Sequence, residues 1–299
     1  LVPADVAGLG IDRQTYALFT SDNGGVLDDL IITRWGEERF FLVVNAACKA
    51  EDIAHLRAHL SGRQLSVLED QALLALQGPA AREVMNALSP AAAQLVFMQG
   101  VAEEIDGAPV YITCSGYTGE DGFEISVPAA YADRIARRLL DDARVVPIGL
   151  GARDSLRLEA GLCLYGHELT PQIDPVQAGL TWSIGKARRA DGERAGGFPG
   201  AEVIFERMQS PPALRRVGLR VQGKRPVREG QVLEEAGGRQ VGEICSACYG
   251  ASVGGPIAMA YVEREFAEEG TTLQVRVRDK LLPVTVSPMP FSPQRYFRG

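Results

Sequence analysis

Charged residues in three glycine-punctuated segments are the candidates for chemistry in this chain. The first segment, GGVLDDLI at 24–31, places the adjacent carboxylates of Asp28 and Asp29 after two glycines and before an apolar strand predicted from Leu30. Neighbouring strand residues point to opposite faces, so only one aspartate can easily face the interior. A carboxylate there must be hydrogen-bonded or act on a ligand, although a hairpin with aspartates capping its turn has the same sequence.

The second segment, GYTGEDGFE at 116–124, combines three glycines with three acids and ends on Glu124. Glycines allow the backbone of such a loop to approach another group closely. Glu124 lies inside the strand that follows, between Phe123 and Ile125, where a bare charge is costly. A carboxylate so placed suits a planar edge with two adjacent N–H donors, such as a guanidine or an aminopyrimidone, but a solvent-facing strand residue has the same pattern.

The third segment, GLGARDSLRLEAGLCLYG at 149–166, predicts a helix from Gly151 to Leu162. Arg153 lies in the first turn, where a cation gains nothing from the helix dipole, so its presence indicates that it is held for an anion. Arg157 follows one turn later and can pair with Asp154, three residues before it. We expect that pair to be structural.

The elements that position these segments follow from periodicity and turn residues. Short runs rich in β-branched and aromatic residues predict strands at 15–19, 30–35, 40–45, 73–76, 110–114 and 123–127. Helical spacing predicts helices at 51–60, 130–141 and 151–162, and Pro79 opens another.

The composition of the chain changes after about residue 200. The charged, glycine-rich stretch 186–200 predicts a linker or exposed loop. Beyond Leu214, short alternating runs separated by glycine turns predict a small antiparallel barrel or sandwich. We therefore expect an α+β region over 1–200, built as two intertwined subdomains, and an all-β module over 201–299.

Bulk properties exclude several classes of protein. The 299 residues are 46% hydrophobic and 23% charged, as in ordinary globular proteins. A net charge of −7 argues against nucleic-acid binding, and no apolar run approaches the roughly 20 residues of a membrane span. The basic clusters at 186–189 and 215–228 are typical of solvated turns and strand ends, or of a docking surface for an acidic partner or a polyanionic tail.

The spacing of the cysteines and histidines does not predict a metal site. Five widely spaced cysteines, an odd number, indicate reduced thiols in an intracellular compartment. Cys245 and Cys248 have the CxxC spacing, but a zinc ribbon needs a second pair, which the sequence lacks. His55 and His59 have a two-ligand spacing, yet their segment reads as a plain amphipathic surface helix.

The three segments, in this order and spacing, resemble the T-protein of the glycine cleavage system, an aminomethyltransferase family. LLALQGP at 73–79, FPGAEVI at 198–204 and MPFSPQRYF at 289–297 match the family as well, so the resemblance covers essentially the whole chain. It implies folate-binding α/β domains around a central site, followed by a small barrel-like C-terminal domain. It also implies that members of the family have a further segment before the position that matches Leu1. This agrees with residues 1–10, LVPADVAGLG, whose sequence is typical of the middle of a domain.

The resemblance implies a role for individual residues. Asp29 corresponds to the essential catalytic carboxylate, Glu124 to the residue that holds the pterin ring, and Arg153 and Tyr296 to residues that contact the folate. Tyr16 and Asn45 match further pocket positions. Trp182, in GLTWSIG, belongs either to the pocket wall or to the core.

The implied reaction transfers the methylene carbon of an aminomethyl group from the lipoyl arm of H-protein to tetrahydrofolate. The products are 5,10-methylene-tetrahydrofolate, ammonia and dihydrolipoyl protein. Tetrahydrofolate is a co-substrate, no metal is implied, and the expected compartment is the bacterial cytoplasm or, alternatively, the mitochondrial matrix.

Two alternative functions share the same fold. One is a folate-binding protein without aminomethyl transfer, although such relatives usually lose the DD turn and the GLGARD context that this chain keeps. The other is a folate-linked demethylase, such as the folate-binding part of a dimethylglycine or sarcosine dehydrogenase. Those dehydrogenases carry a flavin domain with GxGxxG, a motif that does not occur here.

Overall fold

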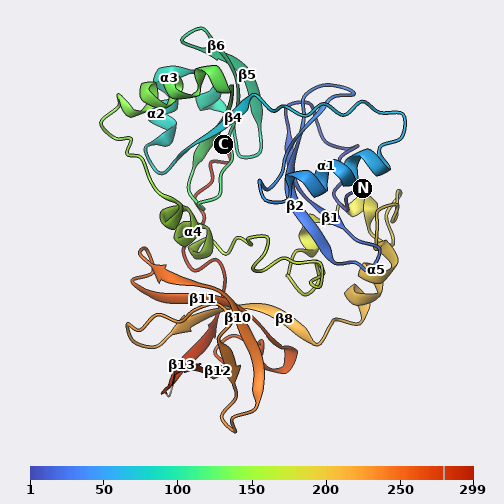
Figure 1. The fold of residues 1–299 in the computed structure, drawn as a ribbon, viewed down its shortest axis with the longest axis vertical. Helices are drawn as coiled ribbons and strands as arrows, with labels where there is room; N and C mark the ends of the chain where they lie inside the picture. Colours follow the sequence, from blue (N-terminus) through green and yellow to red (C-terminus); the bar gives the residue numbers. More distant parts are fainter. Residues whose placement is uncertain (279) are drawn as a thin grey trace.

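Three β-sheets, each with its own hydrophobic core, organise the chain (Figure 1). The computed structural model describes residues 1–278 and 280–299. The first sheet and the second sheet lie side by side, and a barrel lies below them in the view of Figure 1. This arrangement is the expected combination of α/β units with a C-terminal barrel.

The first sheet has the antiparallel order β1-β2-β3, with helix α1 beside it. Its elements are β1 (Gln14–Thr20), β2 (Val26–Arg34), β3 (Phe40–Val43) and α1 (Lys49–His59). A Cβ on Gly25 would overlap the carbonyl oxygen of Pro171, so the turn before β2 requires glycine there. We predicted that this strand begins at Leu30, after the two aspartates, and that was wrong. Strand pairing continues to Val26, so Asp28 and Asp29 both lie inside β2.

The second sheet has the order β4-β7-β6-β5, and two helices cover one of its faces. Phe123 and Ile125 of β7 are fully buried in the core on the helical side, with Met85 of α2 and Ile135 of α3. Because side chains alternate along a strand, Glu124 points to the opposite face. The elements are β4 (Gln71–Gln77), α2 (Ala81–Leu88), η1 (Ala92–Gln94), β5 (Gly100–Ile105), β6 (Ala108–Thr113), β7 (Gly122–Pro128) and α3 (Ala129–Leu140).

The C-terminal part is a closed six-stranded barrel with the order β10-β11-β8-β13-β12-β9, every pair antiparallel. The barrel predicted from the alternating runs beyond Leu214 is therefore confirmed. Its elements are β8 (Leu214–Val221), β9 (Val232–Glu234), β10 (Gln240–Gly250), β11 (Gly255–Glu263), η4 (Arg264–Phe266), β12 (Thr272–Val277) and β13 (Lys280–Ser287).

Helix α4 (Leu150–Glu159) lies between the second sheet and the barrel (Figure 1). Arg157 is 1% exposed and pairs with Asp154 at 2.8 Å, so the predicted structural pair is confirmed. The same guanidinium also binds Glu168 at 2.6 Å and the hydroxyl of Ser246 in β10 at 2.8 Å. The buried ion pair thus joins α4 to the loop that follows it, and the hydrogen bond to Ser246 joins α4 to the barrel.

The stretch 186–200 is a loop that packs beside the first sheet. The N–H of Gly185 donates to Pro3 O, Arg194 pairs with Asp5 at 2.7 Å, and the hydroxyl of Thr20 donates to Pro199 O. The short helical elements around it are η2 (Thr181–Ser183), η3 (Lys186–Arg188) and α5 (Ala201–Gln209). The division of the chain at residue 200 stays a prediction.

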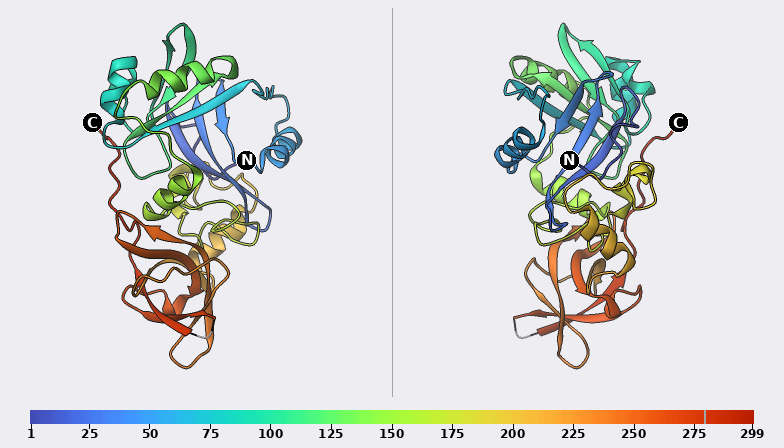
Figure 2. Two further views of the ribbon diagram at one scale, coloured as in Figure 1. Left: turned by 60° about the vertical axis from the view of Figure 1, so that its left-hand side comes forward. Right: turned by 90° about the vertical axis from the view of Figure 1, so that its right-hand side faces the viewer.

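The last residues, 288–299, form a C-terminal strap from the barrel back to the second sheet (Figure 2). Along the strap, Phe291 N–H donates to Glu159 O and Arg295 N–H donates to Gly119 O. At its end, the N–H of Phe97 donates to Phe297 O, and the Phe297 ring lies 4.0 Å from the Arg82 guanidinium. The strap therefore holds the barrel, α4 and the second sheet in contact.

Among the described residues, none of the helices has both the length and the apolar character needed to cross a membrane. In the same part of the chain the five cysteines are free, and no group of His, Cys, Asp and Glu side chains is arranged to hold a metal ion.

Candidate functional site

The carboxylate of Asp29 is held by two neutral donors, one on β1 and one just after β3. Strand pairing places Leu18 opposite Asp29 and Ile31 opposite Tyr16, so Tyr16 and Asp29 share one face. The Tyr16 hydroxyl donates to Asp29 Oδ2 at 2.9 Å, and Asn45 Nδ2 donates to Asp29 Oδ1 at 2.8 Å. Three of the predicted site residues are therefore in direct contact.

Burial raises the pKa of Asp29 to about 6. The hydrogen bonds from Tyr16 and Asn45 favour the charged form and oppose this shift, whereas the neighbouring Asp28 carboxylate adds to it. A carboxylate that titrates close to neutrality can accept a proton and return it, which is the property of a general base or acid.

Trp182 stacks on Tyr16, with 5.3 Å between the ring centroids and 29° between the planes. Its side chain is 62% exposed, so Trp182 belongs to the wall of the site and not to the core. Burial and the Asp29 carboxylate both raise the pKa of Tyr16 well above its usual value. Tyr16 therefore stays a neutral hydrogen-bond donor.

Tyr117, which we did not single out from the sequence, connects two parts of the site. The Arg153 guanidinium lies 4.6 Å from the centre of its ring, and its hydroxyl donates to the carbonyl of Cys163. Burial raises the pKa of Tyr117, and the charge of Asp29 contributes to that increase. Its place in the GYTG segment was the only sequence clue, because the contact with Cys163 spans 46 residues.

Glu124 lies on the face of the second sheet that the helices leave open. The Ser115 hydroxyl donates to Glu124 Oε2 at 2.6 Å and lies 2.7 Å from the Thr113 hydroxyl. Strand pairing places Glu124 between Ala75 and Thr113. The carboxylate is partly exposed and anchored through one oxygen, which leaves it able to accept N–H donors from a ligand.

A hydrogen-bond network centred on Gln77 fixes the loop before Glu124. Its side-chain amide donates to Ser115 O at 2.9 Å, and its oxygen accepts from the Thr118 hydroxyl at 2.9 Å. A Cβ on Gly116 would overlap the Gln77 side chain, so glycine is required for this close approach. The glycines of this segment were expected to allow a close approach to another group. Gly116 does so, and the group that it approaches is the Gln77 side chain of the protein itself.

Arg153 and Tyr296 lie near the same loop. Arg153 is exposed apart from its stacking on Tyr117. Tyr296 stacks on Phe97, with 4.0 Å between the ring centroids, and the adjacent Arg295 pairs with Glu120 of the loop. The structure thus places Glu124, Arg153 and Tyr296 around the loop 115–120, whereas Tyr16, Asn45 and Asp29 form a second, directly bonded group.

Several cations of the predicted basic clusters form hydrogen bonds with backbone carbonyls of the protein. Arg216 donates to Ala178 O at 2.8 Å, and Arg189 donates to the carbonyls of Ile184 and Thr181, both at 3.3 Å. The exposed cations of the second cluster are Arg215, Arg220, Lys224, Arg225 and Arg228.

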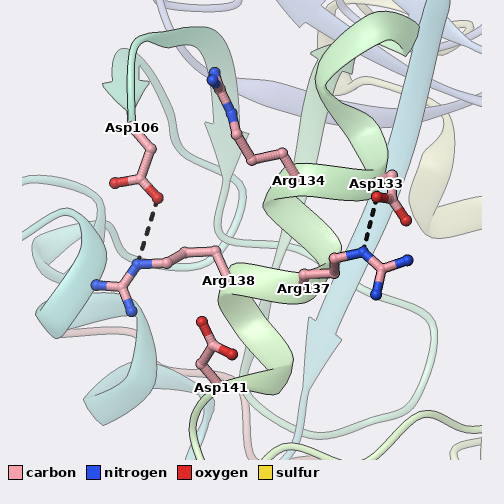
Figure 3. A pocket seen from close by; sticks show the side chains of 6 residues that line it. All are labelled: Asp106, Asp133, Arg134, Arg137, Arg138 and Asp141. Atoms are coloured by element: carbon pink, nitrogen blue, oxygen red, sulfur yellow. Dashed lines mark hydrogen bonds and ion pairs between the residues drawn. The ribbon is translucent and has the colours of Figure 1, made fainter.

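Among the surface hollows of the described residues, one of about 420 Å³ lies beside α3 (Figure 3). Arginines and aspartates line it together, with Arg138 paired to Asp106 at 3.4 Å and Arg137 to Asp133 at 2.8 Å. A smaller one, of about 20 Å³, lies between the 118–120 loop and α4. Neither contains a predicted site residue, and mixed charges in the larger one cancel, so we place the candidate site at Asp29.

Two family models together match nearly the whole chain. The model described as the GCVT N-terminal domain matches residues 1–188, and the one described as the glycine cleavage T-protein C-terminal barrel domain matches residues 215–292. The second match falls on the six-stranded barrel, whose strands run from Leu214 to Ser287.

Similar proteins include mitochondrial aminomethyltransferases of Solanum tuberosum and Gallus gallus. The potato protein is 41% identical over 100% of this chain and 75% of its own length, and the chicken protein 42% identical over 99% and 76%. The crystal structure of glycine cleavage system aminomethyltransferase T from Bartonella henselae matches with a TM-score of 0.91 and 42% identity, covering 99% of this chain and 80% of that one.

Proposed function

Because the chain belongs to the glycine cleavage T-protein family, we propose that it is a tetrahydrofolate-dependent aminomethyltransferase. The observation that carries the proposal is the Asp29 carboxylate, held by Tyr16 and Asn45 on the face of the first sheet where Trp182 lies exposed. Chemistry on a small basic amine needs such an ionisable group near neutrality, and the pKa of Asp29 is raised to about 6.

In the proposed reaction, the donor is the aminomethyl thioether on the lipoyl arm of H-protein. Its methylene carbon forms bonds to N5 and N10 of tetrahydrofolate, while the C–S bond and the bond to the amino nitrogen break. The two N–H protons of tetrahydrofolate end on the departing thiol and amine, which gives dihydrolipoyl protein and ammonia. No oxidant or reductant takes part.

Asp29 has two tasks in this reaction. At neutral pH its carboxylate stabilises positive charge that develops on the methylene carbon when either leaving group departs. It also accepts a proton from a folate nitrogen as the new C–N bond forms. Tyr16 and Asn45 keep both carboxylate oxygens directed, so little reorganisation is needed during the reaction.

Glu124, Arg153 and Tyr296 are the proposed folate contacts. The open side of the Glu124 carboxylate suits the N–H and NH2 donors of a pterin edge. Arg153 keeps its charge while it stacks on Tyr117, which suits it to the negatively charged glutamyl part of the folate. Tyr296 offers an aromatic face on the C-terminal strap.

The proposed partner is a lipoyl-bearing H-protein, and the exposed cations of the second basic cluster favour an acidic docking surface on it. These cations are Arg215, Arg220, Lys224, Arg225 and Arg228. The relatives come from plant and animal mitochondria and from a bacterium, so the proposed compartments are the mitochondrial matrix and the bacterial cytoplasm.

The test measures tetrahydrofolate binding and ammonia release separately in the Asp29→Asn variant. We expect tetrahydrofolate binding within about threefold of wild type, because the amide keeps the shape of the side chain. Ammonia release from aminomethylated H-protein should fall about 100-fold or more, as when a charge-stabilising group is removed from a transition state.

Asp22→Asn is the matched control, since Asp22 is exposed in the turn before the same strand. It should keep both activities. Normal ammonia release by a folded Asp29→Asn variant would contradict the assignment of Asp29. Tetrahydrofolate binding by the wild type without any ammonia release would instead favour the alternative of a non-catalytic folate-binding protein.

A further inference from the structure

Asp28, which the proposed reaction does not use, is buried without a cationic partner. It lies on the face of β2 opposite to Asp29 and is 0% exposed. Its hydrogen-bond donors include the backbone N–H of Asn45 at 3.2 Å to Oδ2 and Asn45 Nδ2 at 2.8 Å to Oδ1. Within the described residues no Lys or Arg forms an ion pair with it. Such a charge is costly unless neutral donors surround it.

Asp52 of α1 approaches Asp28 from the helix. Asp52 is 3% exposed, and its buried Oδ2 atom accepts no hydrogen bond from any donor among the described residues. The two carboxyl groups are nevertheless within hydrogen-bonding contact. A proton on Asp52 accounts for both the unpartnered oxygen and the two adjacent carboxyl groups. It makes that oxygen a hydrogen-bond donor to Asp28, and it removes one of the two negative charges.

Asn45 connects this acid pair to the site. Its side-chain nitrogen donates to Asp28 Oδ1 and to Asp29 Oδ1, both at 2.8 Å, and lies 3.1 Å from Asp29 O. The amide therefore takes its orientation from Asp28 as much as from Asp29. A change that moves Asp28 also moves the donor that directs Asp29.

We propose that Asp28 and Asp52 share one proton and that this acid pair positions Asp29 through Asn45. The positioning role rests on the proposed function of Asp29, whereas the shared proton does not. Asp28 and Asp52 are thus positioning residues, with no contact to substrate required of either.

The groups that face the pair are acids or neutral donors. They are Asp29 on β2, Cys48 and Glu51 at the start of α1, and Tyr165 in the loop after α4. Burial, contact with Asp28 and the charge of Glu51 together raise the pKa of Asp52 to about 8. The negative charges of Asp28, Glu51 and Asp29 favour the protonated form of Asp52 at neutral pH.

The direct test of the shared proton is infrared spectroscopy of the full chain labelled with carboxyl-13C aspartate. At pH 7.5 we expect the C=O band of a protonated carboxylic acid in the wild type and its absence in Asp52→Asn. Asp22→Asn is the matched control, since it makes the same substitution at an exposed residue outside the pair and should keep the band. Absence of the band in the wild type would overturn the shared proton.

The positioning role is tested by the pH profile of kcat for ammonia release. Asp52→Asn should stay within about twofold of wild type, because its amide donates the same hydrogen bond to Asp28. Asp52→Ala should lower kcat by about tenfold, with little change in KM for tetrahydrofolate. The acid limb of its pH profile, where kcat falls as the pH decreases, should also move to higher pH. A displaced Asn45 no longer stabilises the charged form of Asp29, so the pKa of Asp29 rises.

Three outcomes are distinguishable. An unchanged acid limb in folded Asp52→Ala would overturn the positioning role, and if that variant does not fold, Asp52→Leu, which fills similar space without a hydrogen-bond donor, serves instead. Rescue by Asp52→Asn supports the role, since a loss of packing alone would not depend on a donor. Full activity of Asp29→Asn would overturn the proposed function, while the infrared result would still decide the shared proton.

Discussion

Asp29 is a residue at which two physical effects oppose each other. Removal from water destabilises its charge, while hydrogen bonds from Tyr16 and Asn45 stabilise it, and the balance leaves the pKa at about 6. Below that pH the acid is neutral and can neither stabilise a cation nor accept a proton. We therefore expect the activity of the wild type to decrease as the pH falls through about 6.

The same shift predicts how Asp29 affects stability. The folded-state pKa lies above the unfolded value of 3.8, so ionisation of Asp29 opposes folding. The cost is absent below pH 3.8, grows as the pH rises through about 6 and is complete above it. Asp29→Asn should therefore be more stable than wild type at pH 8, by up to about 3 kcal/mol at 1.36 kcal/mol per pKa unit.

Urea unfolding of both proteins at pH 5 and pH 8 measures this difference. The advantage of the variant should be larger at pH 8, and Asp22→Asn should show no such dependence. A variant that is less stable than wild type at pH 8 would contradict the prediction and would mean that the hydrogen bonds outweigh the burial of the charge.

At the scale of elements, α4 is attached to the barrel by a buried cation. Arg157 binds Glu168, which is 0% exposed, and reaches Ser246 on β10. The helix also carries Arg153 on an exposed position, so its attachment fixes where that cation lies. Arg157 thus connects three separate segments, namely α4, the loop that follows it and β10. Loss of these contacts would disturb the packing of α4 and also the position of Arg153.

We expect Arg157→Met to destabilise the protein by about 3–5 kcal/mol, because it leaves the Glu168 charge buried and unpaired. Chemical denaturation of single and double variants measures the effect. Adding Glu168→Leu should recover much of the loss, since the unpaired charge is then gone. Arg137→Met, in an exposed pair on α3, is the control and should change little. Equal losses in the single and the double variant would show that packing, and not charge, holds the helix.

At the scale of the whole molecule, the C-terminal strap joins parts that have separate cores. It leaves the barrel, passes α4 and ends against the second sheet (Figure 2). There Phe297 stacks on Arg82, and Tyr296 stacks on Phe97. Arg82 is itself fixed by two hydrogen bonds to Asp121 in the loop before Glu124. The strap therefore stabilises the loop around which the proposed folate contacts gather.

Phe297→Ala should loosen this end of the molecule without unfolding the barrel. Loss of a cation–π contact of about 1 kcal/mol predicts roughly fivefold faster hydrogen exchange in the loop 115–122. Amides of β11 provide the internal control and should be unchanged. Faster exchange throughout the protein would contradict a local role of the strap and indicate a general loss of stability.

Much of the architecture is predictable because local patterns are strong. Alternation beyond Leu214 predicted the barrel, and helical spacing around Arg157 predicted both its helix and its pair with Asp154. The start of β2 was misplaced, since the polar pair DD resembles a turn and only pairing with β1 shows that it is a strand. Tyr117 was missed because nothing near it in sequence indicates its contact with Cys163.

The family and the residue types available for chemistry can be read from the sequence, since the ordered motifs containing Asp29, Glu124 and Arg153 are recognisable without coordinates. Alternation along a strand also predicts that Asp28 and Asp29 point to opposite faces. That α1 covers Asp28 and brings Asp52 against it, and that Asp29 contacts Tyr16, follows from the three-dimensional packing alone. The pleat defines two faces, but which one a helix buries depends on packing between residues far apart in the chain.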